Sequence, residues 1–225
     1  MSLFQLRKYG ILITIFVLNL VSLFLTFVYA PPEATLGDGY RIFYLHVPAA
    51  WVSYLAFGVT LLGSLKFLIS KSYKWDMIAD ASAKLGVTFC GVATLLGSIW
   101  ANIAWGTYWN WDARETTTLI LLLTYIVYLS FRMAIDDKEK RARLSSVLGV
   151  LGFICVPLSY ASVQLVTLHP GGGIPLSKLH LTSPMLFTLM FALVSVTTIY
   201  FFLLKLTSDL MNIEERLRII RYKEG

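Results

Sequence analysis

Residues 9–30, YGILITIFVLNLVSLFLTFVYA, contain no charged side chain, and this stretch decides the class of fold. A helix needs roughly 20 mainly apolar residues to cross the hydrocarbon core of a bilayer. The run is also longer than the roughly 7–15 apolar residues of a cleaved signal peptide. We therefore expect an uncleaved helix that spans the membrane.

The rest of the chain repeats this pattern. Of the 225 residues, 57% are hydrophobic and only 14% are charged, against roughly 25% charged residues in an average soluble domain. The long uncharged stretches predict an all-α integral membrane bundle of six transmembrane helices, formed by residues 1–225 as a single domain. The expected spans are residues 9–29, 46–66, 84–104, 116–135, 144–166 and 183–205.

The positive charges lie almost entirely on one side of this predicted bundle. All but three of the 19 Lys and Arg residues fall there, the exceptions being Arg41, Arg114 and Lys178. Because short cytoplasmic loops retain Lys and Arg, we expect both termini to be cytoplasmic. The orientation of the spans then accounts for the net charge of +6, and we expect no nucleic-acid partner. Residues 207–225 form a basic cytoplasmic tail, for which an amphipathic helix on the lipid surface is one interpretation.

The second external loop is rich in tryptophan. Residues 105–115 read WGTYWNWDARE, and a belt of aromatic rings at the membrane interface accounts for one or two such residues but not for the whole group. If the segment is helical, Trp105, Trp109 and Asp112 share one face. A planar, apolar ligand with an anionic edge would suit that face, because indoles stack on flat rings and Arg114 can bind carboxylates. Haem fits this description, and a quinone is the alternative.

The three histidines all lie at or beyond the predicted external boundary. They are His46, His169 and His180. Neutral imidazole is an axial ligand of haem iron, and two separate loops can supply one ligand to each face. An isolated interfacial histidine more often only hydrogen-bonds near the headgroups. The neighbouring tryptophans favour His46 and His169 as ligands, with His180 as the reserve candidate.

The remaining polar residues of the sequence give fewer indications of function. Arg41 and Lys178 are either partners of haem propionates or solvated loop charges. The sequence has no GxxxxGK[ST] phosphate loop and no nucleophile and base at a recognisable spacing. We also identify no paired carboxylates within the predicted spans, which disfavours proton-coupled chemistry.

Four motifs together resemble a known family. They are GDGYRI at 37–42, LHVPAAW at 45–51, WGTYWNWDAR at 105–114, and Ser162-Val163 followed by Leu168-His169. This combination resembles the haem-handling CcmC/CcmF/CcsA family of cytochrome c biogenesis, which carries a tryptophan-rich WWD motif, and within it the short CcmC branch (haem exporter protein C). The resemblance covers essentially the whole chain.

The resemblance implies a site and a function. Trp105, Trp109, Trp111 and Asp112 would form an external platform for haem b, with Arg114 beside it. His46 and His169 would be the axial ligands of the iron. The protein would bind haem on the periplasmic side of a bacterial inner membrane and present it to a periplasmic, CcmE-like haem chaperone.

The resemblance also implies partners. Because the chain has no nucleotide-binding loop, it would be the non-ATPase membrane subunit of an ABC-type complex with CcmA-like and CcmB-like subunits and a small, single-span CcmD-like subunit. Lipid surrounds it, and no nucleic acid is expected. It would be a handover protein rather than a catalyst in its own right.

Two residues depart from the expected pattern. Glu115 stands where the short branch has an apolar residue and the longer relatives have Glu, and Pro170 replaces a polar residue after the second histidine. Glu115 therefore supports an alternative, a cytochrome c haem lyase that attaches haem directly to the apocytochrome. A transporter of haem or another small molecule is the other alternative, although we find no polar groups near the midplane of the predicted spans.

Overall fold

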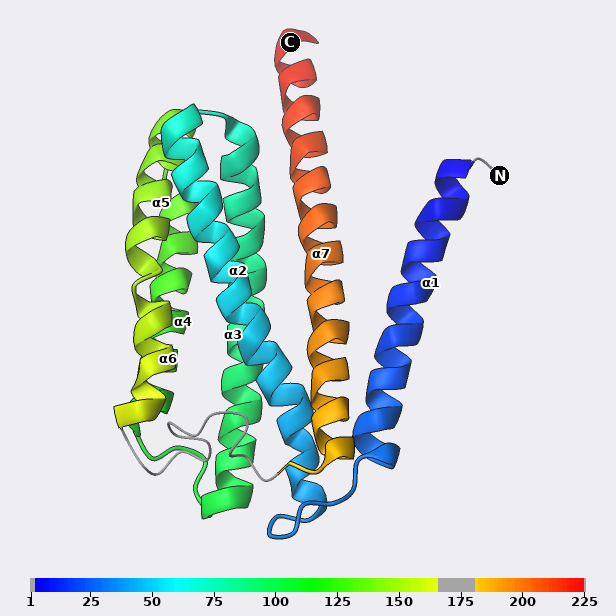
Figure 1. Ribbon diagram of the computed structural model, residues 1–225. Helices are drawn as coiled ribbons and strands as arrows, with labels where there is room; N and C mark the ends of the chain where they lie inside the picture. The colour runs from blue at the N-terminus through cyan, green and yellow to red at the C-terminus, as the bar shows by residue number, and fades with distance from the viewer. Residues whose placement is uncertain (1–2, 166–180, 225) are drawn as a thin grey trace.

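The computed structural model describes residues 3–165 and 181–224, and in these ranges the chain is built almost entirely of helices (Figure 1). The α-helices are α1 (Leu3–Phe24), α2 (Phe43–Ser70), α3 (Tyr73–Trp105), α4 (Ala113–Met133), α5 (Lys138–Gly152), α6 (Cys155–Leu165) and α7 (Ser183–Glu224). A π-helical turn, Leu25–Tyr29, extends α1, and a 3-10 turn, Asp38–Ile42, precedes α2.

Six segments are long and apolar enough to cross a membrane. They are Tyr9–Tyr29, Asp38–Ser70, Tyr73–Trp105, Ala113–Met133, Lys138–Ser162 and Ser183–Arg218. The predicted all-α bundle of six spans is thereby confirmed, and the chain is a multi-pass membrane protein. The fifth span consists of two helices, α5 and α6, which a turn at residues 153–154 separates.

Helices α2 to α6 form one group, and α7 and α1 lie beside it (Figure 1). Helices α2 to α6 pack together, α7 leans against α2 and α3, and α1 contacts α7 near the end of the bundle that carries the α3–α4 loop. We call this the loop end. Both termini lie toward the opposite end.

Close packing at the centre depends on small residues. The Phe57 and Tyr125 rings stack 3.8 Å apart between α2 and α4. A Cβ atom on Gly86 of α3 would lie 2.5 Å from the Phe57 ring. The absence of a side chain at Gly86 therefore lets α3 approach α2 around this aromatic pair, as such residues do in membrane helix pairs.

An ion network joins α3 and α4 at the end opposite the α3–α4 loop. Arg132 donates two hydrogen bonds to Asp76, of 2.7 and 3.0 Å, and its Nε lies 3.3 Å from Asp80. All three residues are buried. The predicted start of the third span near residue 84 is too late for the helix, because α3 begins at Tyr73 and so includes both aspartates. Arg132 points inward to them rather than outward to the headgroups.

The basic tail is also different from the surface helix considered above. Helix α7 runs without a break from Ser183 to Glu224, so residues 207–224 continue the last span. Within this stretch Glu215 forms an ion pair with Lys138 at the start of α5. Nothing in this stretch turns the chain parallel to a membrane plane.

Candidate functional site

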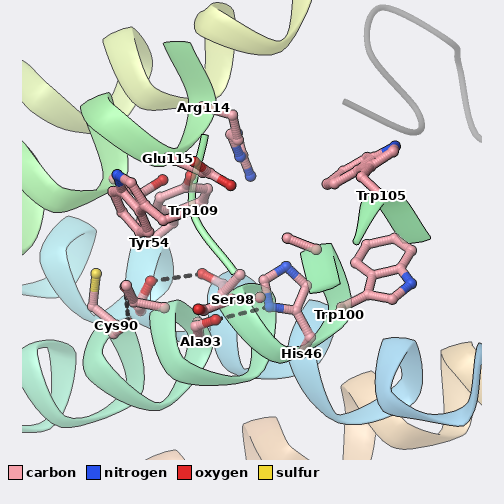
Figure 2. Close-up of a pocket in the computed structure, with 16 residues that line it drawn as sticks. His46, Tyr54, Cys90, Ala93, Ser98, Trp100, Trp105, Trp109, Arg114 and Glu115 are labelled. Atoms are coloured by element: carbon pink, nitrogen blue, oxygen red, sulfur yellow. Dashed lines mark hydrogen bonds between the residues drawn. The ribbon is translucent and has the colours of Figure 1, made fainter. Parts of the chain in front are cut away.

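A pocket opens at the loop end between α2, α3, α4 and the tryptophan loop, residues 106–112 (Figure 2). His46 and Tyr54 of α2, Trp100 and Trp105 of α3, Trp109 of the loop, and Arg114 and Glu115 of α4 are among the residues that line it. The free volume between these side chains is about 50 Å³. The structure thus brings together four of the predicted site residues: His46, Trp105, Trp109 and Arg114.

His46 is held in a defined orientation. Its Nδ1 lies 2.9 Å from the carbonyl oxygen of Ala93 on α3, and its ring lies 5.8 Å from the Trp100 ring. A carbonyl oxygen only accepts hydrogen bonds, so Nδ1 carries the proton and Nε2 carries the lone pair. This is the arrangement in which a metal-ligating histidine is fixed by a backbone carbonyl.

Gly97 makes room for the imidazole. A Cβ atom at this position would lie 2.8 Å from His46 Cε1 and 3.2 Å from Nδ1. Because any side chain on Gly97 would push the ring away from α3, the hydrogen bond to Ala93 depends on this glycine. The sequence offered no signal for this role, since His46 and Gly97 are far apart in the chain.

The tryptophan loop is not helical. Helix α3 ends at Trp105, where Gly106 adopts a left-handed conformation with φ of 76°, and α4 begins only after Asp112. The expectation that Trp105, Trp109 and Asp112 share one helical face is therefore wrong. A glycine cap followed by an aspartate cap interrupts the helix between them.

The tryptophans of this segment take different positions. Trp105 and Trp109 line the pocket, whereas Trp111 is 69% exposed and is not among the lining residues. The Trp109 and Trp111 rings meet edge to face with centroids 5.7 Å apart. Trp111 adopts φ of 60°, which is uncommon for a bulky residue. Trp111 thus supports the loop from outside.

Asp112 and Glu115 form a reciprocal cap at the start of α4. Asp112 Oδ1 accepts a 2.7 Å hydrogen bond from the Glu115 backbone N–H. Glu115 Oε2 accepts hydrogen bonds of 2.8 and 3.0 Å from the backbone N–H groups of Asn110 and Trp111. This is a variant of the capping box, and the D-x-x-E spacing was a signal that sequence reasoning missed. Glu115 has a clear structural role in holding the loop.

Arg114 anchors α6 as well as lining the pocket. It donates a 2.8 Å hydrogen bond to the Ser159 carbonyl oxygen, and its guanidinium lies 5.7 Å from the centre of the Tyr54 ring. The Ser159 hydroxyl contacts the Tyr54 hydroxyl at 3.0 Å and the Thr118 hydroxyl at 3.1 Å. These contacts fix α6 at Ser159, shortly before residues 166–180 begin.

The other predicted site residues are distributed differently. His169, His180 and Lys178 lie outside the described residues. Arg41 does not line the pocket. It pairs with Asp38 at 2.8 Å and donates to the carbonyl oxygens of Thr26 and Ala30. Arg41 therefore ties the 3-10 turn to the end of the first span, and its proposed contact with propionates is not supported.

The pocket has the chemical features that haem binding needs. It combines the Nε2 lone pair of His46 with flat aromatic faces. The indole N–H groups of Trp100 and Trp109 are buried and have no hydrogen-bond partner among the described residues. The Arg114 guanidinium, which also lines the pocket, fits the anionic edge of a porphyrin. The residues present thus fit the group.

Comparison with known proteins identifies the family of the chain. The family model of Heme exporter protein C, CcmC, matches residues 3–222. The chain is 37% identical over 175 residues to Heme exporter protein C of Bradyrhizobium diazoefficiens, a match that covers 75% of this chain and 66% of the relative. It is 34% identical over 146 residues to the Escherichia coli K12 protein of the same name, covering 64% of this chain and 60% of the relative.

A plant relative extends the match. A putative cytochrome c biosynthesis ccmC-like mitochondrial protein of Marchantia polymorpha is 32% identical over 191 residues, which is 84% of this chain and 81% of that protein. The bacterial matches thus leave about a third or more of each relative uncovered. Both the family model and these identities cover most of the present chain, which belongs to the Heme exporter protein C family.

Proposed function

We propose that this protein binds haem b at the loop end of the bundle and presents it to a haem chaperone during cytochrome c maturation. The observation that carries the proposal is the placement of His46. Its imidazole is oriented by Ala93 in a pocket with Trp105, Trp109 and Arg114, in a chain of the Heme exporter protein C family. When bound, haem supplies the iron and the vinyl groups that are later attached to cytochrome thiols.

The residues of this chain would hold the haem without reacting with it. His46, through Nε2, and His169 would hold the haem iron. Trp105 and Trp109 would pack against the flat ring and exclude water, and Arg114 would bind the propionates. Asp112 and Glu115 hold the loop in place rather than contact the ligand.

The proposal also states how the protein is oriented in the membrane and which partners it has. The loop end faces the periplasm, and both termini face the cytoplasm, in agreement with the position of Lys and Arg at the opposite end. The bound haem would pass to a CcmE-like chaperone. ATP hydrolysis by a CcmA-like subunit, in complex with CcmB-like and CcmD-like subunits, would supply the energy for releasing the loaded chaperone.

The role of Glu115 favours handover over direct lyase chemistry. Its carboxylate accepts two backbone hydrogen bonds within the loop, which explains a glutamate at this position without a catalytic step. Purified protein loaded with haem and mixed with apocytochrome alone should therefore form no thioether product. Formation of holocytochrome in this mixture would contradict the proposal and favour the lyase.

The aromatic platform is tested by replacing its rings. We expect the double variant Trp105→Leu/Trp109→Leu to retain several-fold less haem per chain than the wild type, because stacking on an aromatic residue contributes about 0.5–1.5 kcal/mol beyond the area buried. Trp51→Leu is the matched control, since Trp51 lies on α2, is 55% exposed and does not line the pocket. Equal haem retention by the double variant and the control would show that the Trp105 and Trp109 rings do not contribute to haem binding.

A further inference from the structure

A second cleft lies between α3 and α7 at the end opposite the tryptophan loop. Its volume is about 590 Å³. Helix α3 contributes Lys74, Met77 and Ile78, and helix α7 contributes residues from Phe201 to Asn212. The cleft is far along both helices from the haem pocket, so it is independent of the proposed function.

The cleft begins where the packing between α3 and α7 ends. Tyr200 directly precedes the first α7 residue of the cleft. Its hydroxyl lies 2.8 Å from the Ser82 hydroxyl, and its side chain is fully buried among residues of α2 and α3. Beyond this contact α7 continues as a single helix, and further along it is joined to the start of α5 by the Lys138–Glu215 ion pair (Figure 1). The side walls of the cleft are thus two rigid helices.

The rim of the cleft is cationic and hydrogen-bonding. Lys74 and Lys205 both line it, and Lys205 forms a 2.9 Å ion pair with Asp209. The three charges sum to one positive charge. The Ser208 Oγ atom, which also belongs to the lining, is buried and has no hydrogen-bond partner among the described residues. These groups can bind a singly charged phosphodiester.

The deeper walls of the cleft are apolar. They are formed by Met77 and Ile78 of α3 and by Phe201 and Leu204 of α7. Phe201 is 52% exposed, so the apolar wall continues onto the outer surface of α7. A ligand that matches both parts has one anionic group attached to a hydrocarbon chain. Inorganic phosphate would use the rim alone, and an apolar helix would offer no anionic group to Lys74.

We propose that this cleft binds one anionic phospholipid, with its phosphate between Lys74 and Lys205 and an acyl chain along Ile78 and Phe201. Basic pockets between membrane helices at the cytoplasmic boundary are suited to such headgroups. The site lies where the predicted sixth span ends, at the level of the headgroups. The lipid would hold the inner half of α7 at a fixed distance from α3.

Native mass spectrometry of the purified full-length chain tests this proposal. The protein is incubated with mixed micelles that contain equal amounts of phosphatidylglycerol and phosphatidylcholine, and retained lipid is counted after stepwise activation. We expect the wild type to retain one phosphatidylglycerol in preference to phosphatidylcholine. The variant Lys74→Gln/Lys205→Gln should lose about 90% of this retention, because each lysine near an anionic headgroup contributes about 1 kcal/mol.

Two further variants distinguish lipid binding in the cleft from a general effect of positive charge at this end of the bundle. Lys71→Gln/Lys140→Gln removes the same charge at the same end of the bundle from exposed residues that do not line the cleft, and it should retain lipid as the wild type does. Ile78→Trp fills the apolar part without changing charge and should also reduce retention. Equal loss in the cleft variant and the Lys71/Lys140 control would overturn the proposal.

Competition identifies the source of the anion. Millimolar inorganic phosphate should leave the bound phosphatidylglycerol in place, because phosphate cannot use the apolar wall. Displacement of the lipid by phosphate, or equal retention of phosphatidylcholine, would contradict a phospholipid site. Circular dichroism on each variant checks that the helices remain folded, so a loss of retention is not a loss of fold.

Discussion

At the scale of single residues, the site depends on a histidine that its neighbours hold in place. His46 donates through Nδ1 to the Ala93 carbonyl, and Gly97 leaves the space that the ring occupies. The sequence identified His46 because histidines are few and lie beside the tryptophan-rich segment. It could not identify Gly97, because the contact joins two helices whose register along one another is set by packing.

Gly97→Ala tests this arrangement. The added methyl group would lie 2.8 Å from His46 Cε1, so we expect the imidazole to move and haem retention to fall by about tenfold, the effect of losing roughly 1.4 kcal/mol of binding free energy. Absorption spectroscopy of the purified variant gives the haem bound per chain. Gly91→Ala is the control, because a Cβ atom there meets nothing within 4 Å.

The control also has a defined expectation. Replacing a helical glycine by alanine stabilises a helix by up to about 1 kcal/mol when the space is free. Gly91→Ala should therefore bind haem normally and melt at the same or a slightly higher temperature. Normal haem binding by Gly97→Ala would show that the His46 orientation does not depend on this glycine.

At the scale of elements, the tryptophan loop owes its shape to the caps on either side of it. Gly106 ends α3, and Asp112 begins α4. The sequence analysis placed the segment in an external loop, and Trp105, Trp109 and Asp112 would share one face only if that loop were helical. Turn chemistry was the stronger signal, since a glycine and a D-x-x-E pattern enclose the loop.

Glu115→Leu should loosen this loop. The change removes the acceptor for the Asn110 and Trp111 backbone N–H groups, and the loss of a capping interaction costs about 0.5–2 kcal/mol. We expect acrylamide to quench tryptophan fluorescence more strongly and haem retention to fall. Glu115→Gln, which keeps one acceptor oxygen, should show a smaller effect. Identical quenching in all three proteins would remove this structural role for Glu115.

The ion network between α3 and α4 gives a prediction about stability. Arg132→Met leaves Asp76 buried without its cation, whereas Asp80 keeps its ion pair with Lys84, and breaking a buried pair in this way costs about 3–5 kcal/mol. We expect a large decrease in the melting temperature in detergent, and Asp76→Asn in the Arg132→Met background should restore part of it. Lys205→Gln, which removes an exposed ion pair, should change stability by less than about 1 kcal/mol.

At the scale of the whole molecule, hydrophobic patterning alone predicted the architecture. Six charge-free stretches gave the six spans because the bilayer admits few structures other than helices of sufficient length. The boundaries were less accurate where charged residues are buried. Asp76 and Asp80 pair with Arg132 and Lys84, so α3 starts earlier than a pattern of uncharged residues indicates.

The position of α7 could not be predicted in the same way. Its apolar part was identified as a span, but the polar part after Lys205 gave no indication that the helix continues to Glu224. Only the packing of Tyr200 against α2 and α3 and the continuation of α7 beyond it define the second cleft. The candidate site at the loop end differs in this respect, because His46, Trp105, Trp109 and Arg114, which line one pocket, belong to two short motifs of the sequence.

The visible absorption spectrum of the detergent-purified protein beside His46→Ala, before and after addition of imidazole, tests the central claim most directly. The account predicts a Soret band from bound haem in the wild type, loss or weakening of this band in His46→Ala, and its recovery when imidazole occupies the vacated ligand position. His169→Ala should behave in the same way if it supplies the second ligand, with His180→Ala as the comparison. A spectrum and haem content unchanged in His46→Ala would contradict the assignment of His46 as an iron ligand.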